Sequence, residues 1–281
     1  MSKVLIIGCG DIGGALAGIL QKEGHDVTGL RRDPPAELST LNCIKADVTN
    51  QQQIAALNLD FDQVVYILSP SSRELDAYKA VFERGVTNIL TAFKKKCPSA
   101  AFTFVSSSRV YGQRNGEWLN EDSLCEPADE RGRILLAAEK RFLSFNDSAT
   151  VVRFSGIYGR SQYLINKLKR GEAVQKKPPY YTNRIHRIDC VSALVFLINK
   201  KAGGEKLKTT YLATDADPAT SWEIANHLTQ KLGLPTPEGL DLGPAADRNK
   251  RLENKRLLEE GFEFKFSSYK DGYNKFSDCE N

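Results

Sequence analysis

The sequence is poor in several features that mark particular classes of protein. It has only three histidines and one methionine among 281 residues, and its six cysteines are scattered without a Cys-x-x-Cys pair. This spacing argues against a zinc module, so we predict no metal site and expect free thiols in a reducing cytoplasm. No apolar run approaches the roughly 20 residues that span a membrane. The first run ends at Gly8, which is too early for a signal peptide.

The sequence also has little excess of one charge sign over the other. The 39 Lys and Arg residues exceed the 35 Asp and Glu residues by only four, and mean hydropathy is −0.38. So small and dispersed a surplus does not predict nucleic acid or a membrane surface as a partner. With 41% hydrophobic residues, the chain can form one large α/β unit or a domain with a smaller lobe.

Short apolar runs alternate with longer amphipathic segments along the first half of the chain. The runs predict strands at residues 3–7, 26–30, 43–46, 64–68, 101–105 and 150–154. Helical spacing of apolar residues predicts helices at 11–23, 73–96 and 133–145. This alternation is typical of right-handed βαβ units and therefore of a Rossmann-type, doubly wound parallel sheet in the α/β class.

The rhythm changes after about residue 156, where the segments become less regular. Here we expect helices at 161–171, 191–199, 221–231 and 249–260, and a strand at 209–213. The sequence thus predicts one α/β domain at 1–156. A smaller C-terminal lobe would occupy 157–281, with residues 185–215 returning to the sheet.

A glycine-rich segment joins the first expected strand to the first expected helix. It reads Gly8-Cys9-Gly10-Asp11-Ile12-Gly13 and fits the pattern G-x-G-x-x-G. The first glycine of this pattern permits a tight turn, the second lets the backbone approach a pyrophosphate, and the third lets helix and strand pack closely. Amide groups at the helix start would then face the phosphates. We predict dinucleotide binding here, with Asp11 and Ile12 included in the site.

Residues after the next strands indicate which dinucleotide is bound. The second strand ends in Arg31 and Arg32, where an acidic residue would be expected for the ribose hydroxyls of NAD. Guanidinium groups pair bidentately with phosphate, so these arginines favour the 2′-phosphate of NADP, although both could be solvated surface residues. Asp47 could accept a hydrogen bond from the adenine amino group or cap a turn. Ser69 follows the fourth strand and is also assigned to the cofactor.

Four further segments resemble the NAD-dependent epimerase/dehydratase family, the extended short-chain dehydrogenases. They are the serine-rich stretch at 105–112 ending in Val-Tyr-Gly, the Arg-x-x-x-x-Tyr-Gly stretch at 153–159, the His-x-x-Asp at 186–189, and the pairing of 249–252 with 260–262. The resemblance implies that Ser107 hydrogen-bonds the substrate oxygen, unless it only caps the following loop. It places Ser108, Tyr111, Tyr158, Arg184 and His186 toward the substrate. His186 could instead be a packing residue, and Arg184 an ion-pair partner.

The family's catalytic Tyr-x-x-x-Lys element is missing. When Arg133 is aligned with the family lysine, Asp129 takes the position of the tyrosine, and no tyrosine lies between Gly112 and Ile157. Arg133 could bind the nicotinamide ribose, but its pKa is too high for a proton relay. Asp129 or Glu130 could act as the acid/base if partly buried.

Two functions follow from this pattern. The first is an oxidoreductase or epimerase that uses NADP more readily than NAD on a hydroxyl or carbonyl carbon of a sugar, nucleotide-sugar or related small molecule. The second is a catalytically weak or inactive NADP-binding sensor or regulatory protein, which the missing tyrosine favours. The expected partners are a small-molecule substrate and a second copy of the chain, because helices such as 73–96 and 133–145 associate in family dimers.

Overall fold

The computed structural model describes residues 1–33, 41–243 and 249–274, and these form two compact units. The first unit, from which the central sheet is built, comprises Met1–Val110, Pro127–Arg153 and Val191–Tyr211. The second unit comprises Tyr111–Glu126, Phe154–Cys190 and Leu212–Asn281. The chain therefore passes between the units several times, whereas the sequence-based division places one boundary at residue 156 and returns residues 185–215 to the sheet.

A seven-stranded parallel sheet forms the centre of the first unit, in the order β12-β7-β5-β4-β1-β2-β3. This confirms the predicted Rossmann-type fold. The strands are β1 (Lys3–Ile7), β2 (Asp26–Arg31), β3 (Asn42–Lys45), β4 (Gln63–Tyr66), β5 (Ala101–Ser107), β7 (Thr150–Phe154) and β12 (Thr210–Ala213). The order runs outward in one direction from β1 and in the other from β4. The point between these two strands is therefore the topological switch point, where ligands bind in such sheets.

The strands form because apolar residues fill both faces of the sheet. Val4, Leu5, Ile6 and Ile7 of β1 are fully buried. In register, Ile7 lies beside Leu30 of β2 and Tyr66 of β4. Continuous apolar runs of this kind are what a parallel sheet covered on both faces requires.

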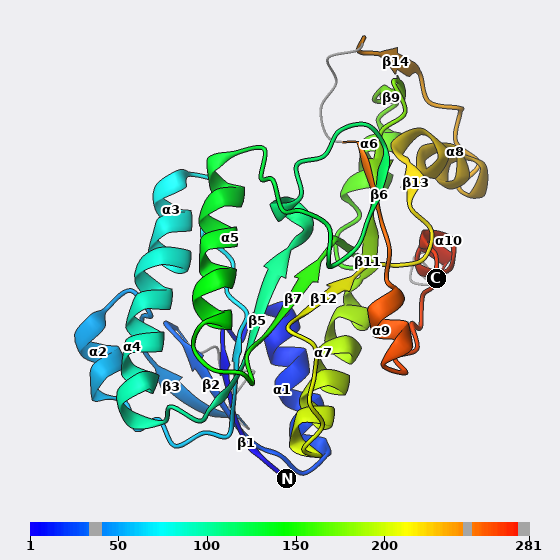
Figure 1. Ribbon diagram of the computed structural model, residues 1–281. Helices are drawn as coiled ribbons and strands as arrows, with labels where there is room; N and C mark the ends of the chain where they lie inside the picture. Colours follow the sequence, from blue (N-terminus) through cyan, green and yellow to red (C-terminus); the bar gives the residue numbers. More distant parts are fainter. Residues whose placement is uncertain (34–40, 244–248, 275–281) are drawn as a thin grey trace. The chain divides into compact units, whose positions relative to one another are not determined.

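Helices cover both faces of this sheet (Figure 1). Helices α1 (Asp11–Lys22) and α7 (Arg187–Ala202) lie on one side, and α4 (Val86–Lys96) and α5 (Glu130–Leu143) lie on the other. The short helix α2 (Gln51–Ala56) packs near α4, and its N-cap Asn50 accepts a hydrogen bond from the Gln53 amide.

The helix predicted over 73–96 is not a uniform α-helix. It consists of α3 (Leu75–Lys79), a π-helical turn (Ala80–Gly85) and α4. The Tyr66 hydroxyl donates to the Val81 carbonyl at 2.6 Å. This carbonyl belongs to the π-helical turn and would otherwise accept only from a backbone amide of the same helix. A Cβ at Gly85 would lie 2.7 Å from the Tyr66 hydroxyl, so glycine permits this approach. The π turn is thus the result of a side chain inserted beside the helix ladder.

Aromatic rings fill the space between the sheet and helices α4 and α5. Phe104 of β5 stacks on Phe142 of α5 with ring centroids 4.6 Å apart. Phe102 meets Phe145 edge-on at 4.9 Å, and Phe93 meets Phe102 edge-on at 5.1 Å. Such pairs add a favourable quadrupole interaction to the burial of large apolar surface. This cluster fixes α5 against β5, the strand that ends at Ser107.

The second unit is built from short strand pairs and helices. Its strands pair as β10–β13, β11–β8, β14–β9 and β15–β6. They are β6 (Glu117–Leu119), β8 (Gly156–Tyr158), β9 (Val174–Lys177), β10 (Tyr181–Thr182), β11 (Arg184–His186), β13 (Ala219–Thr220), β14 (Gly239–Asp241) and β15 (Lys250–Leu252). Its helices are α6 (Tyr163–Lys169), α8 (Ser221–Lys231), α9 (Lys255–Glu259) and α10 (Tyr269–Asn274).

Of two helices that the sequence predicts in this unit, the structure confirms one and corrects the other. The helix predicted at 221–231 is confirmed as α8, and a capping box between Thr220 and Glu223 explains its sharp start. The helix predicted at 249–260 is wrong in its first part, because Lys250–Leu252 forms a strand parallel to β6 and the helix begins at Lys255. Pairing with β6 satisfies backbone groups that a helix would have satisfied within itself.

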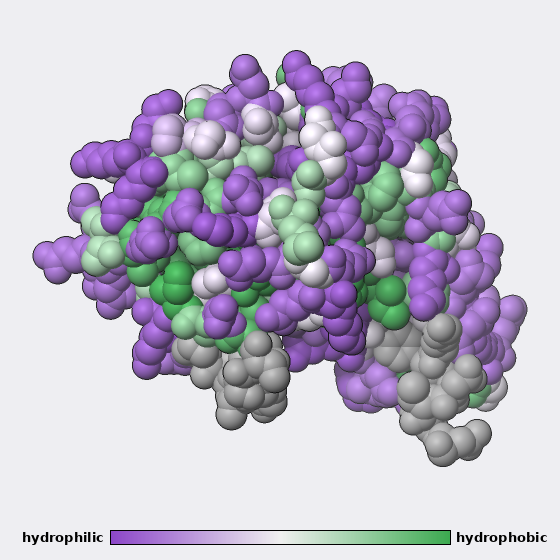
Figure 2. Space-filling model, turned by 90° about the horizontal axis from the view of Figure 1, so that it is seen from below, coloured by the Kyte–Doolittle hydropathy of each residue, from purple (hydrophilic) through white to green (hydrophobic). Residues whose placement is uncertain are grey.

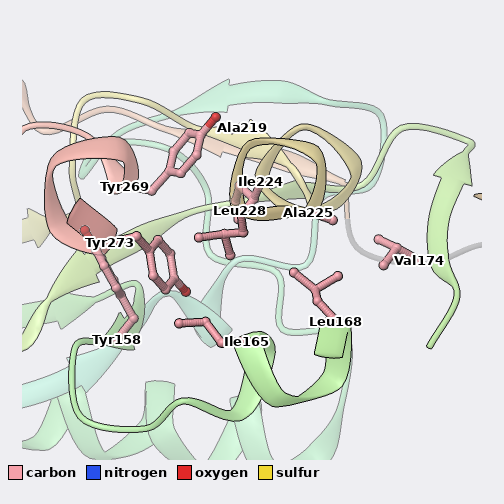
Figure 3. Packing of buried hydrophobic residues seen from close by; sticks show 10 residues of the cluster. All are labelled: Tyr158, Ile165, Leu168, Val174, Ala219, Ile224, Ala225, Leu228, Tyr269 and Tyr273. Carbon is pink, nitrogen blue, oxygen red and sulfur yellow. The ribbon is translucent and has the colours of Figure 1, made fainter. Parts of the chain in front are cut away.

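An aromatic and aliphatic cluster forms the core of the second unit (Figure 3). Tyr158 stacks on Tyr273 of α10 at 4.9 Å, and both rings are almost fully buried. The cluster consists of Tyr158, Ile165, Leu168, Val174, Ala219, Ile224, Ala225, Leu228, Tyr269 and Tyr273. It joins α6, α8 and α10, which are separated in sequence, into one packed core.

Hydrophilic side chains cover much of the face shown in Figure 2, with smaller apolar areas between them. None of the helices in the described ranges combines the length and apolar character needed to cross a membrane. The five described cysteines are free thiols, while Cys279 lies outside the described residues. Within the same ranges, no group of three His, Cys, Asp or Glu side chains could hold a metal ion.

One buried lysine makes the stability of the first unit depend on pH. The Lys201 ammonium of α7 donates to the Phe102 carbonyl at 2.8 Å and to Thr103 Oγ1 at 3.0 Å. Burial lowers the pKa of Lys201 from its ordinary 10.5 to about 7. Between these two values the unfolded chain holds a proton that the folded chain has lost, so the contribution of Lys201 to stability increases as pH rises.

We therefore expect Lys201→Met to remove part of the pH dependence of the unfolding free energy between pH 7 and 10.5. Denaturant unfolding at several pH values measures this difference. Lys206→Met, at an exposed position of the same charge, is the matched control and should leave the wild-type slope in place. Equal slopes for wild type and Lys201→Met would contradict the assignment.

Candidate cofactor and active site

The glycine-rich segment lies at the switch point of the sheet, between β1 and α1. Gly8 has φ of 109°, a left-handed conformation that side chains rarely adopt. Its amide donates to the Leu30 carbonyl at 3.1 Å, and a Cβ on Gly8 would lie 2.3 Å from the Ile67 carbonyl oxygen. Gly8 is therefore required by the turn and by the close approach of the segment that follows β4.

The other two glycines of the pattern have different surroundings. A Cβ on Gly13 would lie 2.3 Å from the Gly8 carbonyl oxygen, so this glycine lets α1 pack against the turn. A Cβ on Gly10 would meet no protein atom within 4 Å, and Gly10 is exposed. The packing of the described chain thus explains Gly8 and Gly13 but not Gly10. A glycine at an open helix start is what close approach of a phosphate to the backbone requires.

The start of α1 also suits an anion. Gly10 is the N-cap, and no side chain caps the helix there within the described residues. Asp11 is exposed, and Ile12 is half-buried. Unsatisfied amides and the positive end of the helix dipole coincide at this point. The residues present therefore fit the pyrophosphate of a dinucleotide.

Basic side chains gather at the end of β2. Half-buried Arg31 donates from Nη1 to the Cys9 carbonyl of the glycine segment at 2.7 Å. Arg32 is exposed. Lys45, which sequence reasoning missed, lies beside Arg31 in register on β3 and is within 3.6 Å of the exposed Asp33 carboxylate. The parallel register of the consecutive strands β2 and β3 brings Lys45 here, so only the strand pairing could have identified it.

The two remaining cofactor residues lie at the carboxyl ends of β3 and β4. Asp47 Oδ1 accepts hydrogen bonds from the Thr49 amide and hydroxyl, both at 2.8 Å. These are the bonds of a turn cap, the alternative that the sequence left open. Ser69 is exposed and lies just beyond the end of β4, which neighbours β1 in the sheet. Its assignment to the cofactor stays a prediction.

Ser107 is the last residue of β5 and is half-buried. Its Oγ accepts a hydrogen bond from the Arg109 amide at 3.2 Å, which leaves its own hydroxyl hydrogen to donate. Ser108 begins a 3₁₀ turn that ends at Val110. The carboxyl end of a parallel strand is where catalytic side chains of such sheets gather.

A buried ionic network that the sequence did not reveal supports the end of β5. The Glu139 carboxylate of α5 accepts a short hydrogen bond from the Ser106 hydroxyl. It also receives Arg153 of β7, whose Nη2 lies 2.7 Å from Oε2 and whose Nε lies 3.1 Å from Oε1. Both charged side chains are less than a tenth exposed. This network accounts for the position of the Arg153 side chain.

Asp129, which the sequence analysis offers as an acid/base, lies at the start of α5. Asp129 is the N-cap and accepts a hydrogen bond from the Gly132 amide at 2.9 Å. Its carboxylate also pairs with Arg109 and lies 3.7 Å from Arg131. Although partial burial opposes ionisation, the Arg109 hydrogen bond, the Gly132 amide and both arginine charges together lower the pKa of Asp129. A low pKa makes Asp129 a poor proton donor near neutrality, so we do not retain it as the acid/base.

Arg133 lies one turn further along α5 and is exposed. Its Nη1 donates to Glu130 Oε2 at 2.9 Å in an i,i+3 ion pair on the helix surface. Pairs of this kind contribute little to stability because water competes for both groups. The pair nevertheless occupies both Arg133 and Glu130, the second candidate acid/base.

The tyrosine and histidine residues assigned to the substrate lie inside the second unit. Tyr111 is 1% exposed, and its hydroxyl donates to the Asn120 carbonyl at 2.8 Å. The Tyr158 ring meets the His186 ring edge-on at 5.2 Å, and His186 in turn packs on Phe266 at 4.0 Å. These environments are those of packing residues. For His186 they agree with the alternative that the sequence left open, a packing role.

Arg184, also in the second unit, has a polar environment. Its Nη1 donates to the Tyr273 hydroxyl at 3.2 Å, and its carbonyl accepts from the Asp215 amide at 2.7 Å. Burial raises the pKa of the neighbouring Asp215 to about 8. Contact of Arg184 with a substrate stays a prediction.

The fold and the glycine segment together define a Rossmann-type protein with a candidate dinucleotide site. The family model for the NAD dependent epimerase/dehydratase family matches residues 4–209. The chain therefore belongs to the NAD-dependent epimerase/dehydratase family, as the sequence motifs predict. No curated protein matches it.

Solved structures agree with this assignment. A protein from Methylobacillus flagellatus, assigned to the NAD-dependent epimerases/dehydratases, is 32% identical with a TM-score of 0.85 and covers 100% of this chain and 99% of its own. UDP-glucose 4-epimerase from Thermotoga maritima, solved with UDP-glucose, is 16% identical with a TM-score of 0.78, covering 99% and 100%. dTDP-glucose 4,6-dehydratase from Bacillus anthracis, solved with NAD, is 16% identical with a TM-score of 0.78, covering 100% and 98%. At 16% identity these two show the shared fold only.

The different surroundings of Gly10 and Gly13 generate a testable contrast. Gly13→Ala should lower the unfolding free energy by about 1–3 kcal/mol, because the new methyl group overlaps the Gly8 carbonyl. Gly10→Ala should change it by less than about 1 kcal/mol while weakening dinucleotide binding. Thermal denaturation and a cofactor fluorescence titration measure the two effects. Intact binding in a folded Gly10→Ala protein would remove Gly10 from the phosphate site.

Proposed function

We propose that this protein is an NAD(P)-dependent oxidoreductase or epimerase acting on a hydroxyl or carbonyl carbon of a sugar, nucleotide-sugar or related small molecule. Its family membership supports this class of reaction. The observation that carries the proposal is the glycine segment, where Gly10 meets no protein atom that would require a glycine. When bound, the nicotinamide would supply or accept a hydride.

We further propose that the cofactor is NADP rather than NAD. Arg31, Arg32 and Lys45 give the ends of β2 and β3 a positive charge, and the exposed Asp33 carboxylate lies 3.6 Å from Lys45. A 2′-phosphate would gain charge-assisted hydrogen bonds from such a group, whereas a ribose hydroxyl needs an acceptor. The structures solved with NAD are too distant in sequence, at 16% to 20% identity, to decide this point.

Arg32→Gln should weaken NADPH binding at least roughly tenfold and leave NADH binding nearly unchanged, because only NADPH carries the extra phosphate. Arg32 is the cleaner test, since Arg31 also contacts the Cys9 carbonyl. Fluorescence titration with both reduced cofactors measures the ratio. Lys22→Gln, at the far end of α1, removes the same charge and serves as the control. Equal losses for the two cofactors would remove the 2′-phosphate assignment.

Ser107 is the group that we assign to the substrate oxygen. Because its Oγ already accepts from the Arg109 amide, its hydroxyl hydrogen can be donated to an oxygen of a bound substrate. The strand alternation that turns Ser106 inward to Glu139 leaves Ser107 on the other face. Ser107 would orient the oxygen, and the proton would have to move through a group other than the family's tyrosine.

The alternative is a catalytically weak or inactive NADP-binding sensor or regulatory protein. A specific observation favours it. Asp129 at the tyrosine position is an N-cap with a lowered pKa, and Arg133 at the lysine position is paired with Glu130 at the surface. Neither arrangement supplies a group whose pKa suits proton transfer near neutrality.

Ser107→Ala should reduce turnover at least roughly a hundredfold for any substrate found among nucleotide-sugars, sugars and small ketones, with NADPH binding retained. Steady-state rates and cofactor titration measure the two properties. Ser144→Ala removes a surface hydroxyl from the end of α5 and should behave as wild type. Binding of NADPH without turnover of any panel member by the wild type would support the sensor instead.

A dimer also belongs to this proposal, with α3, α4 and α5 as the candidate surface. The side chain of Leu75 on α3 is 41% exposed, which an interface of this kind would cover. A cytoplasmic location, in keeping with free thiols, is proposed on the same footing.

A further inference from the structure

Two cysteine sulfurs share the space above Gly29 of β2, on one face of the sheet. A Cβ on Gly29 would lie 2.7 Å from Cys9 Sγ and 3.4 Å from Cys43 Sγ. Cys43 of β3 is the register partner of Gly29, and residues paired in a parallel ladder point to the same face. The Cys9 sulfur thus takes the place of the side chain that Gly29 lacks, directly beside the side chain of Cys43.

The two cysteines lie in different segments of the first unit. Cys9 stands between Gly8 and Gly10 in the glycine segment, and its carbonyl accepts from Arg31 Nη1 at 2.7 Å. Cys43 belongs to β3, the strand at one edge of the central sheet. A covalent bond between the two sulfurs would therefore join the turn at the start of α1 to this edge strand.

The two thiols differ in their access to solvent. Cys9 is buried, its Sγ donates to the Ile6 carbonyl at 3.5 Å, and burial raises its pKa to about 12. Cys43 is only half-buried; burial raises its pKa as well, although the Arg31 charge opposes this rise. A cysteine reacts with an oxidant through its thiolate, and only where the oxidant can reach the sulfur. Cys43 is therefore the thiol that reacts first, with Cys9 beside it.

We propose that Cys9 and Cys43 form a redox-sensitive pair, which a peroxide converts to a disulfide that weakens dinucleotide binding. The Cys43 thiolate attacks one oxygen of hydrogen peroxide, the O–O bond breaks, and Cys43 becomes a sulfenic acid. The hydroxide that leaves takes up the proton of the Cys43 thiol. The Cys9 sulfur then attacks the Cys43 sulfur, the S–O bond breaks, and the oxygen leaves as water with the Cys9 proton. The two thiols lose two electrons, which reduce the peroxide to two molecules of water.

The disulfide acts on the candidate cofactor site through the position of the turn. A disulfide holds its sulfurs about 2.05 Å apart, much closer than two sulfurs in non-bonded contact, so Cys9, Cys43 or both must move. Displacement of Cys9 changes its contact with Arg31 and shifts the neighbouring amides, to which we assign the phosphates. This effect on binding rests on the function proposed above, whereas formation of the disulfide does not.

Oxidation of the full chain with hydrogen peroxide, followed by alkylation of the remaining thiols, tests the pair. Trypsin places Cys9 in peptide 4–22 and Cys43 in peptide 33–45, each as the only cysteine of its peptide. We expect mass spectrometry to find these two peptides joined, within a chain that migrates as a monomer on a non-reducing gel. Fluorescence titration should show NADPH binding at least roughly tenfold weaker after oxidation, with recovery in dithiothreitol.

Variants decide whether this pair is responsible. Cys43→Ser should bind NADPH like the reduced wild type, and peroxide should neither join the two peptides nor weaken binding. Cys43→Ala replaces it if Cys43→Ser fails to fold, which a thermal melt reports. Cys125→Ser removes another half-buried cysteine and should respond to peroxide as the wild type does.

Three results would overturn the proposal. They are the absence of the joined peptides from oxidised wild type, NADPH binding by the joined protein as tight as by the reduced protein, and an equal loss of affinity in Cys43→Ser on oxidation. A reduced wild type that binds neither NADPH nor NADH is a different result. It contradicts the proposed function, while the joined peptides, which are detected without cofactor, still establish the disulfide.

Discussion

A single buried carboxylate organises the part of the first unit where chemistry is expected. Glu139 would be costly to bury alone, and its two partners come from different strands. Ser106 on β5 and Arg153 on β7 are thereby fixed to α5 in one relative position. Because neighbouring residues of a strand face opposite ways, holding Ser106 inward also sets the direction of Ser107. The position of the candidate substrate contact thus depends on a buried ion pair between Glu139 and Arg153.

The same helix explains why the site departs from its family's pattern. In this chain the first turn of α5 is stabilised by the Asp129 cap and by the arginines at positions 109 and 131. A carboxylate that contacts an amide and two cations has a lowered pKa, and this favours its ionised form. The contacts that stabilise the start of the helix therefore oppose protonation of Asp129, which aligns with the tyrosine of the family's Tyr-x-x-x-Lys element. The lowered pKa of Asp129 therefore argues against this residue as a proton donor near neutrality.

Local patterns predicted the features that depend on local physics. The buried strands, the amphipathic helices and the glycine turn each follow from residues within a few positions of one another. The π turn at Ala80–Gly85 was not predictable, because its cause is the Tyr66 hydroxyl on a strand. Strands of two or three residues, such as β10 and β15, carry no periodicity to detect. The Arg251 guanidinium lies 4.9 Å from the centre of the Trp118 ring and 5.0 Å from that of Tyr181, and only the folded chain brings these three residues together. The partners of Glu139 were hidden for the same reason.

The π turn also limits how this helix can change in evolution. One extra residue in a turn rotates everything beyond it by about 100° around the helix axis. Here α3 packs near α5 and α4 packs near α2, so the two halves of this continuous helix contact different neighbours. Deleting a residue from Ala80–Gly85 would restore regular winding and turn the apolar face of α4, with Ile89 and Phe93, away from its core. Unlike a surface loop, this segment therefore has a length that the packing on both sides determines.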